Sequence, residues 1–289
     1  MKLTSTKISA LIPTYKRVDK LEKCIQEILS CEPLPSEIII HIDQGDSETA
    51  SFLTSKVYPL VHWFSSNTSQ GPGGGRNLLI QKANSPIIAS FDDDSWPLDK
   101  DYFATATELF SLYPKAAVIN AQEIRPSSLS SHPRNSHIKE VNSFQNCATL
   151  MRREAFLETS GYLPLRYAYG MEEVDVALQV LEQGWQILES SNLRVFHDTQ
   201  LAHHQSPGIN AAHIANTALL AYLRYPIAYW PLGILQVFNR VRYAVSVRRW
   251  NGISQGLWQI PHLLWRYRDQ RQPVQVHTLE LSRKLASKL

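Results

Sequence analysis

The chain has 289 residues, of which 44% are hydrophobic and 19% are charged, and its formal net charge is +3. This is the composition of a folded globular protein with room for one or two domains, and it excludes a disordered chain. A net charge of +3 does not indicate nucleic-acid binding, and no DNA- or RNA-binding motif is found, so we expect no nucleic-acid partner.

Features of the sequence that report on location point to the cytoplasm. Cys24, Cys31 and Cys147 form no C-x-x-C pair, which indicates free thiols in a reducing compartment. The N-terminal MKLTSTKISA lacks the apolar segment of a signal peptide. The uncharged stretch 225–239 is too short for an ordinary spanning helix. We expect a cytoplasmic protein, with peripheral contact at the inner face of the cell membrane as the one qualification.

Strands and helices alternate along the first two thirds of the chain. Residues 7–13 predict a buried strand, and 18–31 predict a helix because Leu21, Cys24 and Ile28 recur at helical spacing. The later predicted elements are strands over 37–43 and 60–66, a helix over 75–83, strands over 85–94, 116–124 and 146–152, a short helix ending near Gly161, a helix over 171–184, and strands over 185–189 and 193–197. This alternation predicts an α/β fold with a mostly parallel sheet.

Two segments interrupt this alternation. Residues 125–142 are rich in serine and proline and predict a long loop inside the domain. Beyond about residue 205 the pattern becomes helical, aromatic and basic. We therefore divide the chain into a ligand-binding part, 1–205, and a C-terminal helical region, 206–289.

Three consecutive aspartates, Asp92, Asp93 and Asp94, directly follow an apolar strand in SFDDDS. Ligands bind at the carboxyl ends of strands in such sheets. Neighbouring carboxylates repel one another and lose hydration there, and a hard divalent cation such as Mg²⁺ or Mn²⁺ would compensate both costs. A solvated turn before the next helix is the alternative.

Several motifs occur in a characteristic order: ISALIPTYKR, the strand-end Asp43, a glycine run with GRN, FDDDS, and YGMEEVDVALQVLEQGWQI. This order resembles the family 2 glycosyltransferases of the GT-A fold, particularly their rhamnosyltransferase-like branch. The resemblance implies a GT-A Rossmann-like sandwich with a central, mostly parallel sheet, followed by the C-terminal helical region. It also implies a metal-dependent, inverting transfer of a sugar from a nucleoside-diphosphate sugar to a hydroxyl of a glycan or lipid-linked saccharide.

The resemblance assigns the metal site to the aspartates and one histidine. Asp94 would be the main ligand of Mn²⁺ or Mg²⁺, and Asp92 would lie near the metal or the ribose. Asp93, the middle residue, is counted with the donor site but is expected to point away from the metal, as alternate strand residues do. His197 follows the strand LRVF and would complete the metal site, with a purely structural histidine as the alternative.

The resemblance places the donor nucleotide beside the first two strand ends. Pro13, Thr14 and Tyr15 would line its pocket, and Asp43 would contact the base, although a loop Asx-turn explains Asp43 equally. The run SQGPGGGRN contributes Gly74 and Arg76. Backbone N–H groups before a helix bind anions, and Arg76 could reach a diphosphate, hold a carboxylate or remain an ordinary surface arginine.

An inverting transfer needs a carboxylate to accept the proton of the acceptor hydroxyl. Glu172, Glu173 and Asp175 begin the helix EEVDVALQVLEQ. At about 100° per residue, Glu173 falls on the apolar face, whereas Glu172 and Asp175 fall on the polar face, where the helix N-terminus explains them. Glu173 also aligns with the family's base, usually an aspartate, so we predict Glu173 as the base and Asp175 as the reserve candidate.

The C-terminal region combines tyrosines and tryptophans with arginines. From residue 219 onward the only acids are Asp269 and Glu280. Such a segment suits a membrane interface or an acceptor, but packing on the catalytic domain explains it as well. Two other functions remain: a sugar nucleotidyltransferase, which PTYKRVDK disfavours because it lacks glycines, and a non-catalytic, membrane-docked glycan-binding scaffold.

Overall fold

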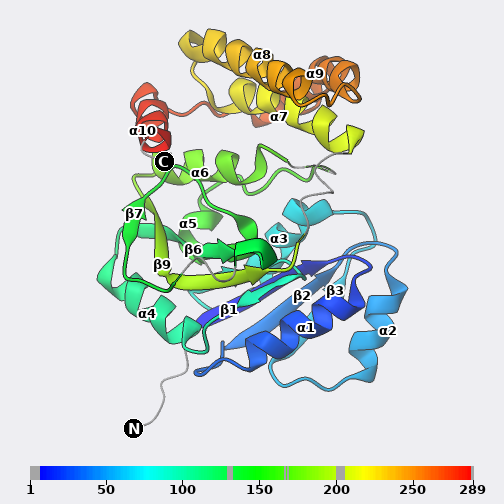
Figure 1. The fold of residues 1–289 in the computed structure, drawn as a ribbon, viewed down its shortest axis with the longest axis vertical. Coiled ribbons are helices and arrows are strands. Elements are labelled where there is room, and N and C mark those ends of the chain that lie inside the picture. Colours follow the sequence, from blue (N-terminus) through cyan, green and yellow to red (C-terminus); the bar gives the residue numbers. More distant parts are fainter. Residues whose placement is uncertain (1–6, 129–132, 166, 168, 200–205, 288–289) are drawn as a thin grey trace.

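The chain folds around one mixed sheet, shown in Figure 1 by a computed structural model that describes residues 7–128, 133–165, 167, 169–199 and 206–287. The strand order is β3-β2-β1-β4-β8-β6-β9-β5, and β7 pairs with β9. The strands are β1 (Ile8–Thr14), β2 (Glu37–Ile42), β3 (Val61–Ser65), β4 (Ile87–Ser90), β5 (Ser95–Pro97), β6 (Ala116–Ile124), β7 (Ile138–Glu140), β8 (Thr149–Arg152) and β9 (Gln186–His197).

The N-terminal half of the sheet is parallel. β1 pairs in parallel with β2 and β4, and β2 pairs in parallel with β3. β6 and β9 are also parallel to each other, whereas β8 runs antiparallel to β4 and β6. The carboxyl ends of β1, β2 and β4 therefore meet at one edge, where Thr14, Asp43 and the three aspartates follow.

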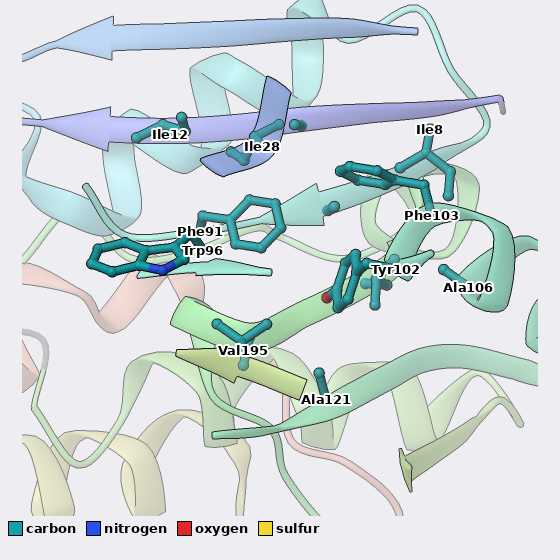
Figure 2. Packing of buried hydrophobic residues seen from close by; sticks show 14 of the residues in the cluster. Ile8, Ile12, Ile28, Phe91, Trp96, Tyr102, Phe103, Ala106, Ala121 and Val195 are labelled. Carbon is teal, nitrogen blue, oxygen red and sulfur yellow. The ribbon is translucent and has the colours of Figure 1, made fainter. Parts of the chain in front are cut away.

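Helices cover both faces of the sheet. One face carries α1 (Val18–Leu29), α2 (Ser47–Ser55) and α4 (Tyr102–Leu112), and the other carries α3 (Gly71–Lys82), α5 (Arg153–Leu157) and α6 (Glu172–Glu182). Figure 2 shows the first of these cores, in which Ile8, Phe91 and Tyr102 come together from a strand, a strand end and a helix. Burial of these apolar side chains fixes the strand ends that carry the polar residues.

The C-terminal region consists of α7 (Pro207–Arg224), α8 (Trp230–Ser246), α9 (Ile253–Arg266) and α10 (Val276–Ala286). A third apolar core, containing Leu178, Leu219 and Leu279, joins it to α6. Figure 1 shows α7 between the sandwich and the two helices α8 and α9. Among the described residues, no helix has the length and apolarity needed to cross a membrane.

The predicted α/β sandwich with a C-terminal helical region is confirmed, but several boundaries differ. The strands predicted over 185–189 and 193–197 form one strand, β9, which continues across a register irregularity: Ala121 of β6 pairs with Ser190, and the next residue, Gln122, pairs with Arg194. Part of the predicted loop 125–142 pairs with β9 as β7. The predicted domain boundary at residue 205 lies outside the described residues and stays a prediction.

Candidate active site

A cavity of about 1180 Å³ opens at the carboxyl edge of the parallel strands. Pro13, Thr14 and Tyr15 line it where β1 ends, as predicted, and Asp92 and Asp93 line it where β4 ends. Its far wall comes from the C-terminal helices, through Ala212, Asn216, Gln255, Gln259, His262, Leu263, Arg266 and Tyr267. The cavity therefore lies between the sandwich and the C-terminal region.

Arg17 neutralises two of the three aspartates. Its guanidinium lies 2.8 Å from Oδ1 of Asp93 and also donates to Oδ2 of Asp94. The Thr14 hydroxyl donates to the other oxygen of Asp93 at 2.9 Å. Burial raises the pKa of Asp93 to about 7, although Arg17 and Thr14 act in the opposite direction. Asp93 lines the cavity and does not contact His197, whereas Asp94 is held between Arg17 and His197, so the expectation that Asp93 points away from the metal stays a prediction.

His197 lies among the acidic groups that were predicted to bind the metal. Its Nε2 is 3.3 Å from Oδ1 of Asp94 and 3.9 Å from Oδ2 of Asp92. Its Nδ1 is 2.6 Å from Glu123 at the end of β6. Burial alone would lower the pKa of His197, but hydrogen bonds to Asp94, Cys147 and Glu123 raise it to about 12. In this arrangement the imidazolium compensates the neighbouring carboxylates.

The atoms around His197 that could act as metal ligands fit a hard divalent cation. Ligand atoms of Asp92, Cys147 and His197 lie within 4.8 Å of one another, and Asp94 adjoins them. Burial raises the pKa of Cys147 to about 11, and sulfur is a ligand that softer metals prefer. The carboxylates of Asp92 and Asp94, together with His197 once a bound cation displaces its Nε2 proton, form a set that suits Mn²⁺ better than a softer metal.

Arg76 is buried, with a relative exposure of 3%. Its guanidinium donates to Oδ1 of Asp92, and its Nε donates to Ser90 at 3.1 Å. Of the roles considered for Arg76, the structure shows that of binding a carboxylate. Gly74 is also buried inside α3, and Gly71 lines the cavity instead. The glycine run allows close packing: a Cβ on Gly75 would lie 2.7 Å from Nδ1 of His41.

Asp43 lines the cavity, but its carboxylate is already bonded. It accepts from the backbone N–H groups of Gln70 and Gly71, at 2.8 and 3.1 Å, where α3 begins, and from the N–H of Gln44 at 2.9 Å. These bonds outweigh burial and lower the pKa of Asp43. The carboxylate thus joins the end of β2 to the start of α3 and makes no Asx-turn bond to the residue two positions on, and contact with a nucleotide base stays a prediction.

Glu172 and Glu173 lie at the N-terminus of α6 beside Arg76. Oε1 of Glu172 accepts from Asn146 at 3.0 Å and is 3.8 Å from Arg76. Burial raises the pKa of Glu172 to about 8, although Arg76 opposes the shift. Burial also raises the pKa of Glu173 above its ordinary value, against bonds to backbone N–H groups and against Arg76. A carboxylate with a raised pKa is suited to accept a proton near neutral pH.

The predicted order of exposure along α6 is wrong. Glu172 and Asp175, assigned to the polar face, are 7% and 1% exposed, while Glu173 is half-buried. The reason is that α7 covers Asp175 through Arg224, whereas Asn146 and Arg76 of the sandwich enclose Glu172. Arg224 of α7, with 0% exposure, donates to both oxygens of Asp175 at 2.5 and 3.2 Å. Asp175 is therefore tied to a structural ion pair.

Three residues of the site were missed by sequence reasoning. Arg17 is the last residue of the motif ISALIPTYKR, three residues past the end of β1, and only this position beside a strand end marked it. Glu123 is the second-to-last residue of AAVINAQEI, and an acid near the end of an apolar strand was a usable signal. Cys147 carried no signal, because its proximity to His197 arises from pairing between distant strands.

Comparisons with known proteins agree with this geometry. The family described as Glycosyl transferase family 2 matches residues 9–167, more than half of the chain, so the chain belongs to that family. The predicted family and the GT-A fold are confirmed, and the rhamnosyltransferase-like branch stays a prediction.

Curated relatives match a short part of the chain. A GalNAc(5)-diNAcBac-PP-undecaprenol beta-1,3-glucosyltransferase of Campylobacter jejuni is 29% identical over 91 residues, 30% of this chain and 29% of that protein. An uncharacterized glycosyltransferase of Rickettsia felis is 35% identical over 94 residues, 32% of this chain and 15% of that protein. The matches thus span less than a third of either relative.

Solved structures share the fold at low identity. A mannosyltransferase from Pyrobaculum calidifontis in complex with GDP-Man and Mn²⁺ has a TM-score of 0.62 and 13% identity, covering 99% of this chain and 81% of that chain. Staphylococcus aureus TarS with UDP-GlcNAc has a TM-score of 0.61 and 16% identity, covering 92% and 81%. GalNAc-T7 with UDP, GalNAc and Mn²⁺ has a TM-score of 0.63 and 13% identity, covering 79% and 50%.

Proposed function

We propose that this protein is a metal-dependent, inverting glycosyltransferase that uses a nucleoside-diphosphate sugar. The observation that carries the proposal is the cavity, in which the β1 end, Asp92 and Asp93 face a wall of C-terminal helices. The family assignment and the fold shared with proteins solved with nucleotide sugars support it. Its acceptor would be a hydroxyl of a glycan or lipid-linked saccharide, the class that the name of the Campylobacter relative suggests.

Asp92, Asp94 and His197 would hold the Mn²⁺ or Mg²⁺. When bound, this cation supplies positive charge that stabilises the diphosphate leaving group. Arg17 lines the same cavity and would contribute a second positive charge after releasing an aspartate oxygen. Pro13, Thr14 and Tyr15 would position the nucleotide beside them.

Glu173 would act as the general base. In the proposed step it takes the acceptor hydroxyl proton while that oxygen forms a bond to the anomeric carbon. The bond between the anomeric carbon and the diphosphate oxygen breaks on the opposite face, and the nucleoside diphosphate leaves with the electron pair. Arg76 would connect the cavity to the start of α6, because it contacts Asp92, which lines the cavity, and lies 3.8 Å from Glu172, the neighbour of Glu173.

The donor site is tested by calorimetry of UDP, GDP and dTDP with Mn²⁺ or with EDTA. The proposal predicts that one nucleotide binds only with metal, and that Asp94→Asn weakens this binding at least tenfold. Asp19→Asn is the matched control, since Asp19 is an exposed acid on the neighbouring α1. Failure of all three nucleotides to bind with either cation would refute the donor site and leave the glycan-binding scaffold as the alternative.

A further inference from the structure

Apolar side chains cover the outer sides of α8 and α9, which lie at the far end of the molecule from β1, β2 and β3 (Figure 1). Trp258 is 82% exposed, Ile234 71% and Trp265 66%. We call this set the α8–α9 outer surface: Ile234, Leu235, Phe238, Leu257, Trp258 and Trp265. So much exposed apolar surface on two adjacent helices is typical of an interaction site.

Glycines fix which sides of α8 and α9 face inward. Gly233 of α8 is buried against α7, where an added Cβ would lie 2.5 Å from Cβ of Ala221. Gly256 of α9 is also buried against α7, and an added Cβ there would lie 2.7 Å from the carbonyl oxygen of Ala211. Residues two positions further along a helix point about 160° away. Leu235 and Trp258 therefore point away from α7, and the outer surface is a fixed feature of the fold.

The charge around this surface has one sign. Residues 225–268 contain no aspartate or glutamate and contain Arg240, Arg242, Arg248, Arg249, Arg266 and Arg268. A second copy of this chain would bring these arginines against one another, which costs free energy. Tryptophans beside arginines on helices that are too polar to span a bilayer instead match the headgroup region of a membrane.

We propose that the α8–α9 outer surface docks on an anionic phospholipid bilayer, with both helices lying in the plane of the interface. The tryptophans and aliphatic side chains enter the acyl boundary, and exposed arginines such as Arg242 and Arg248 meet phosphate groups. Docking itself needs no donor or acceptor.

The same helix links the bilayer to the cavity. Gln255, Gln259 and His262 lie on one side of α9 and line the cavity, while Trp258 and Trp265 lie on the adjoining, outward side. Docking therefore places the cavity mouth beside the membrane. Resting on the proposed function, this geometry selects a lipid-linked acceptor whose saccharide enters along α9 while its lipid stays in the bilayer.

Docking is tested by sedimentation of the full chain with vesicles of phosphatidylcholine alone or mixed with phosphatidylglycerol, without nucleotide sugar. We expect binding to the anionic vesicles that weakens as salt is added. Trp258→Ser combined with Trp265→Ser should reduce the partition coefficient at least tenfold, and so should Arg242→Gln combined with Arg248→Gln. These side chains are exposed, so the melting temperature should stay unchanged.

Trp63→Ser is the matched control, because Trp63 is an exposed tryptophan on β3, in the sandwich. Equal loss in this control, equal binding to neutral vesicles, or no binding of the wild-type chain would overturn the proposal. Gel filtration adds a further check: a dimer that the tryptophan variants convert to monomers would assign the surface to self-association. Calorimetric donor binding is measured without vesicles, so failure of docking and failure of the donor site are separate results.

Discussion

Arg17 already supplies positive charge where the proposed metal would supply it. Its guanidinium contacts Asp93 and Asp94, and His197 contacts the other oxygen of Asp94. A cation that binds Asp94 must compete with this contact, and the displaced guanidinium would then face the cavity that Arg17 lines. Arg17 would therefore weaken the affinity for the metal and strengthen the affinity for the nucleotide donor.

Arg17→Gln should tighten Mn²⁺ binding about fivefold, because a half-exposed ion pair of about 1 kcal/mol no longer competes. The same change should weaken nucleoside-diphosphate binding, because one phosphate partner is lost. Titration calorimetry measures both affinities. Arg134→Gln, which removes a surface arginine paired with Asp101, should change neither. Parallel weakening of metal and nucleotide would contradict the competition.

The raised pKa of Glu173 predicts the acid limb of the rate profile. A base works only when deprotonated, so kcat/KM should rise with pH through an apparent pKa above the ordinary glutamate value of 4.5. Because Glu172 lies beside it, that apparent pKa belongs to the pair. Glu173→Gln should abolish the limb and lower kcat by a factor on the order of a thousand while nucleotide affinity persists. A profile that is flat down to pH 4.5 would contradict this role.

Single residues show where sequence reasoning succeeds. Pro13, Thr14, Tyr15 and Asp92 line one cavity because strand ends in parallel sheets share an edge, and their contacts with a nucleotide or a metal stay predictions. The helical wheel misjudged Glu172 and Asp175, because a wheel assumes one buried face and α6 is covered on two sides. Partners contributed by α7 cannot be read from the sequence of α6 alone.

At the scale of elements, the glycine run seats α3 against the strand ends. A Cβ at Gly75 would press on the buried His41 ring, whereas a Cβ at Gly74 would meet only Gln70 at 3.1 Å and Pro164 at 3.4 Å. Gly75→Ala should therefore lower the free energy of unfolding by about 1–3 kcal/mol through overpacking. Gly74→Ala is the adjacent control and should be nearly neutral, since alanine favours the helix. Chemical denaturation measures both, and equal effects would contradict this packing.

The ion pair between Asp175 and Arg224 joins α6 to α7. Asp175→Asn leaves the fully buried guanidinium without its counter-charge and should cost about 3–5 kcal/mol. The melting temperature should fall by on the order of 10 °C. Glu158→Gln, at an exposed position, should leave it unchanged.

Turnover separates this structural role from catalysis. Well below its melting temperature, Asp175→Asn should retain most of its activity, whereas Glu173→Gln should not. An Asp175→Asn variant that is stable but inactive would restore Asp175 as a candidate base.

The elements themselves were predicted with uneven success. β1, β2 and α1 were found because their apolar residues follow one period without interruption. The start of α3 was placed four residues late, because the glycines and proline of GPGG have a low helix propensity. This segment is helical where it packs against Tyr162 and Pro164. β7 was missed for a similar reason, since three partly buried residues form a strand only when β9 is beside them.

At the scale of the whole molecule, the cavity is built by two regions that are far apart in sequence. β1 provides one wall, and α9, more than 230 residues later, provides the other. Local patterns identified the first wall and left the C-terminal region open between membrane contact and packing. In the structure α7 packs on the sandwich, while α8 and α9 keep an exposed outer surface for which membrane contact stays a proposal.

The central claim is that this cavity transfers a sugar from a nucleotide donor with Glu173 as the base. The most direct test is release of nucleoside diphosphate from a panel of UDP-, GDP- and dTDP-sugars, with Mn²⁺, Mg²⁺ or EDTA, in the presence of vesicles that carry lipid-linked saccharides. We expect release from one donor that requires metal and is lost in Glu173→Gln but retained in Glu158→Gln. Metal-dependent release that survives in Glu173→Gln would contradict the assignment of the base, and no release from any donor would contradict the proposed function.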